Sequence, residues 1–285
     1  MILITGATGT VGSAVLDTIG RSGAPHRALY RSAAEAERAP AGTEAVIGDF
    51  GDRASLDAAL VGIDSVFLVC SPIPDLVRLE TNVIEACAAA GVRRVVLSSA
   101  LGAGDYPKSF PAWHRQVEER LKASGLGFCI LRPNSFMQNV VAFFAPSIRA
   151  EGAFYAAMGT APIAFIDIKD LAEIAADALR SARRDGQVHE LHGPEGLNYD
   201  AVAASISRLA GVEARFVDIP RAAQQQAMLG LGMPEWQVTA LLDLQEYYTG
   251  GQGGRPDGTL ETLLGRPARR MDAFIQENLA AFRKG

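Results

Sequence analysis

Several features that define other protein classes are scarce or missing in this sequence. There are only three cysteines, Cys70, Cys87 and Cys129, and they lie in apolar runs without the paired spacings of disulfide frameworks or zinc sites. The histidines other than His114 are too dispersed to indicate a metal centre. Lys plus Arg number 27 and Asp plus Glu 32, so the formal charge of −5 provides no general attraction for polyanions. The sequence therefore predicts no metal site and no nucleic-acid partner.

Long apolar runs are also missing. The longest, such as "MQNVVAFFAP", fall well short of the roughly 18 residues that indicate a membrane-spanning helix. No positively charged, apolar leader precedes "ILIT", which begins at residue 2 and runs directly into glycines. We therefore expect a cytoplasmic protein without a membrane partner, with reduced, buried thiols. We expect it to act as a monomer or homodimer on a small-molecule substrate.

The first half of the chain alternates short β-branched runs with amphipathic helical segments. The runs are "ILIT", "HRALYR", "AVIGD", "SVFLVC", "RRVVLSS" and "GFCILRP". This alternation is typical of repeated β-α-β units around a parallel sheet. We therefore predict an α/β fold of the Rossmann type, with a doubly wound parallel sheet.

The pattern loosens after about residue 150. The segments "IAFID" and "VHELHG" still indicate strands and "IKDLAEIAADALRS" a helix, but from Leu197 onward the chain is mainly helical, with "VEARFVDIP" as one strand candidate. The stretch "YYTGGQGGRPDG" predicts an exposed or mobile loop. We expect a Rossmann domain over residues 1–150, to which residues 161–193 return, and a smaller, mostly helical substrate-binding domain over residues 194–285.

Three glycines in "ITGATGTVG", Gly6, Gly9 and Gly12, lie between a predicted strand and a predicted helix. There, the first glycine permits a tight turn, the second lets a pyrophosphate approach the backbone, and the third lets the helix pack against the sheet. The helix N-terminus adds unpaired N–H groups and a partial positive charge. A ligand-free turn is the alternative, but together with the strand alternation the glycines favour an NAD(P)-binding site.

The end of the second predicted strand distinguishes NADP from NAD. A carboxylate there would bind the ribose 2′-hydroxyl of NAD, and an arginine would accommodate the 2′-phosphate of NADP. No acid occurs between Thr18 and Ala34, whereas Arg31 and Ser32 follow the strand. These side chains suit a phosphate, so NADP(H) is favoured over NAD(H). Arg27 is another candidate for the same role. The remaining alternative is that Arg31 is only a solvated surface residue.

Other small and polar residues follow the predicted strands, where ligands gather in open α/β sheets. Asp49 could accept a hydrogen bond from the adenine amino group, or could simply cap the following helix. Ser98 and Ser99 lack a nearby G-x-S-x-G motif, so a hydrolase triad has little support. In addition to the three glycines and Arg31 and Ser32, the cofactor contacts predicted in this half of the chain are Thr8, Thr10, Val11, Asp49, Phe50, Cys70, Ser71, Ser98 and Ser99.

Eight segments, taken in order, cover almost the whole chain and carry a family resemblance. They are "LITGATGTVG", "YRS", "GDF", "RRVVLSSALGA", "WHRQVEERLKASGLGFCILRPNSFMQN", "FIDIKDLAEIAADAL", "HELHGPEGLNYDAVAASIS" and "LLGRPARRMDAFIQEN". They resemble the NmrA-like branch of the atypical short-chain dehydrogenases. Those proteins include NAD(P)H-dependent quinone reductases, flavin-free azoreductases and redox sensors. The resemblance implies a nicotinamide cofactor without flavin or metal.

The chain departs from the wider superfamily at the catalytic pair. Typical short-chain dehydrogenases carry Tyr-x-x-x-Lys, but here Tyr106 is followed too closely by Lys108 and the next helix reads "WHRQVEER". His114 is the candidate proton donor in its place, because an imidazole titrates near neutral pH. Glu118 lies four residues later on the same predicted helical face and could orient or charge it. The alternative is that His114 only packs near the cofactor.

The resemblance also implies roles for "RPNSFMQN" after the sixth predicted strand. Pro133, Asn134 and Phe136 should form the floor under the nicotinamide, with Phe136 and Met137 facing the substrate. The alternative is a strand end and a core-facing helix start, since apolar stripes are usually core. Tyr155 and Trp236 are further candidate walls for a flat aromatic substrate.

The leading hypothesis is an oxidoreductase that passes a hydride from NADPH to an electrophilic acceptor such as a quinone or azo compound. A carbonyl or enone acceptor ranks second among enzymes because it needs a better-placed acid. A non-catalytic NADP(H)-binding redox sensor is the rival from another class, favoured by the missing Tyr-x-x-x-Lys pair. A nucleotide-sugar or isoprenoid enzyme would usually need the missing tyrosine.

Overall fold

The computed structural model describes residues 1–283, and these fall into two compact units. The first unit contains residues 1–105, 110–132 and 171–190, and the second contains residues 106–109, 133–170 and 191–283. Residues 171–190, part of the segment 161–193 predicted to return, lie in the first unit. Residues 133–150, 161–170 and 191–193, which the sequence analysis places in the Rossmann domain, lie in the second unit. What each unit binds stays a prediction.

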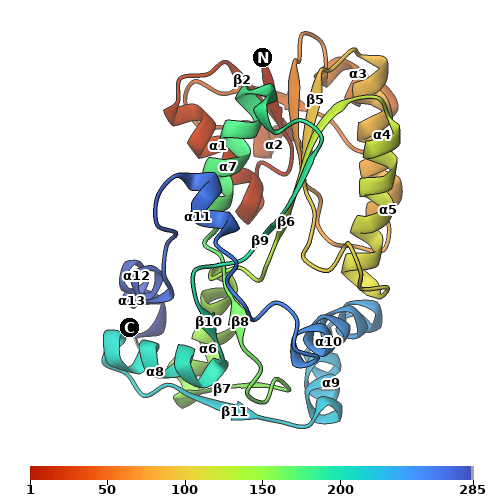
Figure 1. The fold of residues 1–285 in the computed structure, drawn as a ribbon. Coiled ribbons are helices and arrows are strands. Elements are labelled where there is room, and N and C mark those ends of the chain that lie inside the picture. Colours follow the sequence, from red (N-terminus) through yellow and green to blue (C-terminus); the bar gives the residue numbers. More distant parts are fainter. Residues whose placement is uncertain (284–285) are drawn as a thin grey trace. The chain divides into compact units, whose positions relative to one another are not determined.

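The first unit is built on a seven-stranded sheet in the order β3-β2-β1-β4-β5-β6-β9 (Figure 1). The strands from β1 to β6 pair in parallel. This confirms the predicted Rossmann doubly wound sheet. The bounds are β1 Ile2–Ile4, β2 His26–Tyr30, β3 Glu44–Ile47, β4 Ser65–Leu68, β5 Arg94–Ser98, β6 Gly127–Pro133 and β9 Gln187–Leu191.

Helices cover both faces of this sheet, with α3, α4 and α5 on one face and α1 and α7 on the other (Figure 1). The α3–α5 face packs Leu56, Ile84 and Leu121 against strand residues of one parity, such as Leu3 and Val66, in one buried cluster. Because successive side chains of a strand point to opposite faces, the neighbouring residues of each strand face the helices on the other side of the sheet. The helices are α1 Thr10–Arg21, α2 Ala33–Ala36, α3 Arg53–Ala59, α4 Leu76–Ala89, α5 Ser109–Ala123 and α7 Ile168–Arg180, followed by a 3₁₀ turn at Ala182–Arg184.

The second unit is mostly helical, with two small two-stranded sheets, β10-β8 and β11-β7. Its helices are α6 Ala145–Glu151, preceded by a π-helical turn at Val140–Phe144, α8 Tyr199–Ala210, α9 Arg221–Gly230, α10 Glu235–Thr249, α11 Thr259–Leu264, α12 Met271–Glu277 and α13 Leu279–Phe282. Its strands are β7 Ala153–Ala156, β8 Ile163–Ala164, β10 Gly196–Leu197 and β11 Arg215–Asp218, the last confirming the strand in "VEARFVDIP".

The Gly-rich stretch after α10 is anchored at its centre. The Gly253 carbonyl accepts hydrogen bonds from the Asn134 side chain at 2.7 Å and from the Ala164 backbone at 2.8 Å. Gly254 is buried against Pro162, whereas residues 251–252 and 255–258 are exposed. The prediction of an exposed loop is therefore wrong for its centre, because the glycines there allow the backbone to pack closely against β8 and β10.

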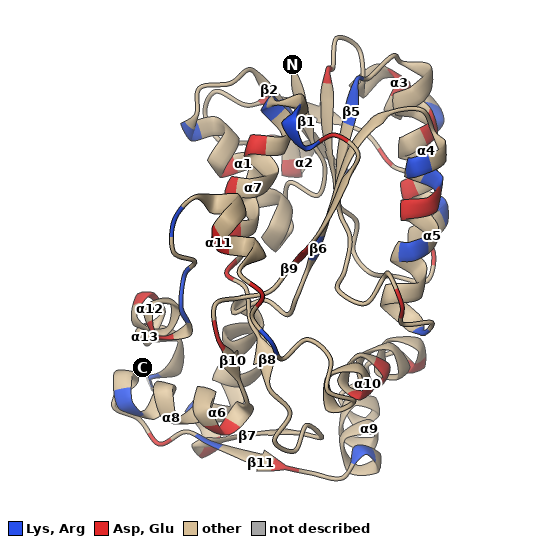
Figure 2. Ribbon diagram, viewed as in Figure 1, with Lys and Arg blue, Asp and Glu red and all other residues tan. Residues whose placement is uncertain are grey.

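Acidic and basic residues are interspersed along α4 and α5 (Figure 2). Mixed signs along these helices give no single-sign surface there for a polyanion. Among residues 1–283, no helix is long and apolar enough to cross a membrane.

Candidate functional site

A pocket of about 230 Å³ lies at the carboxyl edge of the first unit's sheet. Strand order reverses between β1 and β4, and ligands of doubly wound sheets bind at such a switch point. Eight of the predicted cofactor residues line it: Gly6, Thr8, Gly9, Arg31, Asp49, Phe50, Cys70 and Ser71. Ala7, Leu29, Tyr30, Glu35, Gly48, Val69, Ile73 and Leu79 complete the lining and were not predicted.

The glycine turn has the geometry that its spacing predicts. Gly6 has φ +60°, in the left-handed region that side chains disfavour. A β-carbon on Gly12 would lie 2.1 Å from the Gly6 carbonyl oxygen, so only a glycine lets α1 pack so close to β1. At Gly9 the nearest atom to an added β-carbon is the Gly6 oxygen at 3.3 Å, and the residue faces the pocket.

The N-terminus of α1 is suited to an anion. Gly9 is the N-cap and provides no side-chain cap, and no acidic residue occupies the first turn. The N–H groups of that turn, which include those of Thr10 and Val11, therefore have no side-chain acceptor from the cap, and the helix dipole adds partial positive charge. A pyrophosphate is the ligand that best fits this arrangement.

Asp49 is held by a local turn. Its Oδ1 accepts a hydrogen bond from the Gly51 backbone at 2.6 Å, and its own N–H donates to Ser55 Oγ at 3.0 Å. The cap of α3 is Asp52, which accepts from the Ala54 N–H. The helix-capping alternative for Asp49 is therefore wrong, and its carboxylate lines the pocket.

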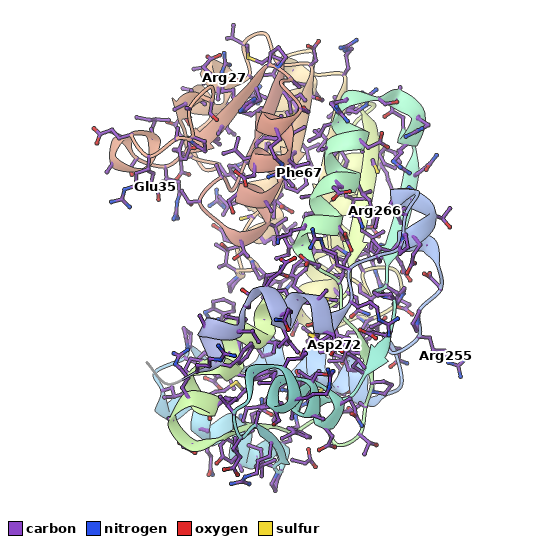
Figure 3. The ribbon with its side chains drawn as sticks, turned by 90° about the vertical axis from the view of Figure 1, so that its left-hand side faces the viewer. Arg27, Glu35, Phe67, Arg255, Arg266 and Asp272 are labelled. Atoms are coloured by element: carbon purple, nitrogen blue, oxygen red, sulfur yellow. The ribbon has the colours of Figure 1, made fainter. Side chains whose placement is uncertain are left out.

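Arg27 and Arg31 lie at opposite ends of β2. Arg27 Nε donates to Glu44 at 2.8 Å and its Nη1 to the Ala59 carbonyl at 2.6 Å, so it is committed to the amino edge of the sheet. Figure 3 labels Arg27 and Glu35, which lie well apart on the first unit. Arg27 is thus excluded as the alternative phosphate ligand.

Arg31 lines the pocket with its side chain 79% exposed, and Ser32 caps the short α2 by accepting from the Glu35 N–H. Glu35 is the charged lining residue that sequence analysis missed. The signal was present, because "SAAE" from residue 32 has the capping-box spacing that folds the fourth residue back over the strand end.

Cys70, just after β4, lines the pocket and is half-buried, so the expectation of a buried thiol is wrong for this residue. Burial raises the pKa of the Cys70 thiol to about 12, which keeps it protonated and unreactive. Glu80 on α4 is fully buried, and burial raises its pKa to about 8 against a smaller lowering by a hydrogen bond from the Cys70 backbone. Glu80 is therefore mainly an uncharged acid at neutral pH.

Ser98 and Ser99, at the end of β5, do not line this pocket. Both are buried, and the Ser99 hydroxyl donates to Glu118 Oε1 at 2.7 Å. Arg132 also binds Glu118 with two hydrogen bonds, of 2.8 and 2.7 Å, and Lys122 adds one at 3.2 Å. Burial works to raise the Glu118 pKa, but these donors outweigh it and hold the pKa below its usual value.

His114 is buried on α5, and its Nδ1 has no hydrogen-bond partner. Burial lowers its pKa to about 4, against a smaller opposing effect of the Glu118 charge. The expectation that Glu118 orients His114 is wrong, because its carboxylate accepts hydrogen bonds from Ser99, Arg132 and Lys122. Its charge does act to raise the His114 pKa, but less than burial lowers it. His114 is thus a neutral imidazole at pH 7, and a proton-donor role would have to use that neutral form.

This neutral state can be tested by following the imidazole C2–H resonances by NMR. We expect the His114 resonance, assigned with a His114→Gln variant, to remain at its neutral position from about pH 8 down to about pH 5. The unfolded state takes up a proton near the ordinary histidine pKa, so this group also costs stability as the pH falls from about 6.5 towards 4. A midpoint between pH 6 and 7 would contradict this.

Asn134, predicted to lie under the nicotinamide, makes structural bonds in the second unit. Its Nδ2 donates to the Gly253 carbonyl, and its Oδ1 accepts from the Tyr248 hydroxyl at 3.0 Å and from the Ser135 N–H at 2.7 Å. Pro133 is buried and Phe136 is half-buried, with a β-bridge to Ile166. These contacts anchor the end of β6.

The predicted substrate residues lie in different environments of the second unit. Met137 is fully buried, Trp236 is half-buried on α10, and Tyr155 is exposed, with its hydroxyl donating to Glu151 at 2.9 Å. A separate cavity of about 350 Å³ is lined by Met158, Gly159, Thr160, Ala161, Pro162, Tyr248, Thr249 and Gly251. The substrate roles of Met137, Tyr155 and Trp236 stay predictions.

The Tyr106–Lys108 segment is held by α10. The Tyr106 hydroxyl donates to the Asp243 carbonyl at 2.9 Å, and Lys108 Nζ donates to Glu246 at 2.6 Å. Burial raises the Tyr106 pKa, the opposite of what a catalytic tyrosine needs. Within residues 1–283, no group of three His, Cys, Asp or Glu side chains is placed to hold a metal ion.

Comparison with known proteins adds to this geometry. The model of the NmrA-like family matches residues 1–271. The chain is 36% identical over 287 residues to the NAD(P)H azoreductase of Xenophilus azovorans, covering 99% of each chain. It is 35% identical over 286 residues to a (4-alkanoyl-5-oxo-2,5-dihydrofuran-3-yl)methyl phosphate reductase of Streptomyces griseus, again covering 99% of each. The structure of the Escherichia coli NADPH-dependent quinone oxidoreductase complexed with NADPH matches with a TM-score of 0.88 at 29% identity, over 98% of this chain and 99% of that one.

Proposed function

The chain belongs to the NmrA-like family, and from this we propose that it is an NADPH-preferring reductase of quinones or azo compounds. That it is an NAD(P)H-dependent oxidoreductase follows from its close relatives, which are named as reductases. The observation that carries the proposal is the pocket at the β1/β4 switch point, with glycines and an uncapped helix N-terminus at one end and Arg31 at the other.

The residues of this pocket fit the adenosine and pyrophosphate parts of a nicotinamide dinucleotide. Gly9 and the first turn of α1 would hold the pyrophosphate, Asp49 the adenine amino group and Arg31 the 2′-phosphate. The cofactor itself supplies the hydride. The chain supplies the fixed position in which the cofactor would be held.

The choice of acceptor follows from the proton donors. The raised pKa of Tyr106 makes this tyrosine a weaker proton donor, and His114 is neutral at pH 7. Quinones and azo compounds can take their proton from water after hydride transfer, so they do not require a strong protein acid. The azoreductase and quinone oxidoreductase named among the relatives support this acceptor class.

The test is oxidation of NADPH and of NADH, followed at 340 nm, with quinones, azo dyes and enones as acceptors. We expect saturable turnover with a quinone or an azo dye and a lower KM for NADPH than for NADH. A reaction without acceptor measures the background oxidation. Cofactor binding without turnover across the panel would contradict the reductase and favour a redox sensor.

A further inference from the structure

We propose that Glu35 sets the balance between NADH and NADPH, because its carboxylate both holds Arg31 and lies beside the place of the ribose 2′-substituent. The inference rests on the proposed cofactor function of the pocket. It assigns to Glu35 a role in specificity and predicts that the native pocket accepts both cofactors.

Two hydrogen bonds, to Ser32 and from Arg31, fix Glu35 at the edge of the pocket. Its backbone N–H donates to Ser32 Oγ at 3.3 Å, and its Oε2 accepts from the Arg31 backbone N–H at 2.9 Å. Its Oε1 lies 4.0 Å from the Arg31 guanidinium. The Glu35 side chain is 29% exposed and that of Arg31 79%, so the carboxylate is the more buried partner.

The charges around the pocket are mixed. The charged side chains that line it are Arg31, Glu35 and Asp49, which is one cation and two carboxylates. The Asp49 charge contributes to the raised pKa of Arg78, but Arg78 already donates a hydrogen bond to Asp75 at 2.9 Å. A 2′-phosphate would therefore meet a single arginine whose guanidinium already faces a carboxylate.

The two cofactors differ only at this position, and Glu35 acts on them in opposite directions. A ribose 2′-hydroxyl can donate a hydrogen bond to a carboxylate, which favours NAD(H). A 2′-phosphate is repelled by the same carboxylate and competes with it for Arg31. The arginine favours NADPH, and Glu35 limits how strong that preference becomes.

The test uses Glu35→Gln, whose amide oxygen can still accept the Arg31 N–H while the negative charge is lost. Glu37→Gln is the matched control, because Glu37 is an exposed acid at the end of the same helix that does not line the pocket. Titration calorimetry with adenosine 2′,5′-bisphosphate and adenosine 5′-monophosphate measures the adenosine site without requiring turnover.

We expect Glu35→Gln to bind adenosine 2′,5′-bisphosphate about fivefold more tightly and adenosine 5′-monophosphate about twofold more weakly, typical of one charge at a partly exposed site. Glu37→Gln should leave the ratio unchanged. Adding Arg31→Met to Glu35→Gln should remove the gain, because the 2′-phosphate then lacks its cation.

The outcomes separate this inference from the proposed function. If neither nucleotide binds the wild-type protein, the cofactor pocket itself is misassigned and both proposals fail. If both bind but Glu35→Gln and Glu37→Gln change the affinity ratio equally, Glu35 only holds the Arg31 backbone and the inference is overturned. An unchanged Tm for Glu35→Gln, with a changed ratio, supports the role in specificity.

Discussion

Replacing Gly12 with alanine is expected to lower the free energy of unfolding by about 3 kcal/mol or more. The added β-carbon would lie 2.1 Å from the Gly6 oxygen, 2.5 Å from the Gly6 carbonyl carbon and 2.7 Å from the Thr5 oxygen. All three atoms are backbone, so relief requires α1 to move away from β1. Urea unfolding followed by circular dichroism measures the loss.

Gly9→Ala is the matched control for that experiment. Gly9 has φ −86° and ψ 165°, which alanine adopts without strain, and the closest contact of the added carbon is 3.3 Å. We expect a stability within about 1 kcal/mol of wild type, but nucleotide binding weaker by about tenfold, because the methyl group occupies the approach of the pyrophosphate. Equal destabilisation by both substitutions would contradict this account of the turn.

Arg132→Met is expected to destabilise the protein by about 3 kcal/mol at pH 7. The Glu118 side chain is 1% exposed, and Arg132 provides two of its four hydrogen bonds and the nearest charge. Losing Arg132 leaves a buried carboxylate with only Ser99 and Lys122 as donors. Methionine keeps the aliphatic volume, so the measured loss reports mainly on the charge.

The pH dependence identifies the cause. The Glu118 pKa is held below its usual value in the native state, so its contribution is present above the unfolded-state pKa and is lost as the pH falls through the native value. The cost of Arg132→Met should therefore shrink between about pH 7 and pH 4, where the orphaned carboxylate takes up a proton. Arg53→Met, which breaks an exposed ion pair with Asp57, should cost no more than about 0.5 kcal/mol at either pH. A constant cost of Arg132→Met would point to lost packing instead.

Much of the first unit could be predicted from sequence because its signals are local. Alternating β-branched runs mark the strands, and parallel pairing brings their carboxyl ends to one edge. Gly6, Arg31, Asp49 and Cys70 come from four strand ends, yet they line a single pocket. The parallel pairing of the strands places them together, because it brings all the carboxyl ends to one edge of the sheet.

The rest depended on side-chain partners that no local pattern encodes. Glu118 pairs with Arg132 and Ser99, and Asn134 with Tyr248 and Gly253, which is 119 residues away. Such partners decide whether a polar group is available for chemistry, because a buried group satisfied by the protein has nothing left to offer a ligand. Glu35 differs, because its position in the pocket does follow from a local pattern. The capping-box spacing of "SAAE" from Ser32 places it there.

The return of α7 and β9 to the first unit has a consequence for biosynthesis. The sheet takes its last strand from Gln187–Leu191, and Ser65 at the start of β4 donates its hydroxyl hydrogen bond to the carbonyl of Leu179 on α7. During translation, residues 1–132 leave the ribosome with one edge of the sheet unpaired and part of one face uncovered. They wait in that state while residues 133–170, which belong to the other unit, are made. Chaperone capture of nascent chains should therefore be strongest for those stalled before about residue 190 and fall once that segment has emerged.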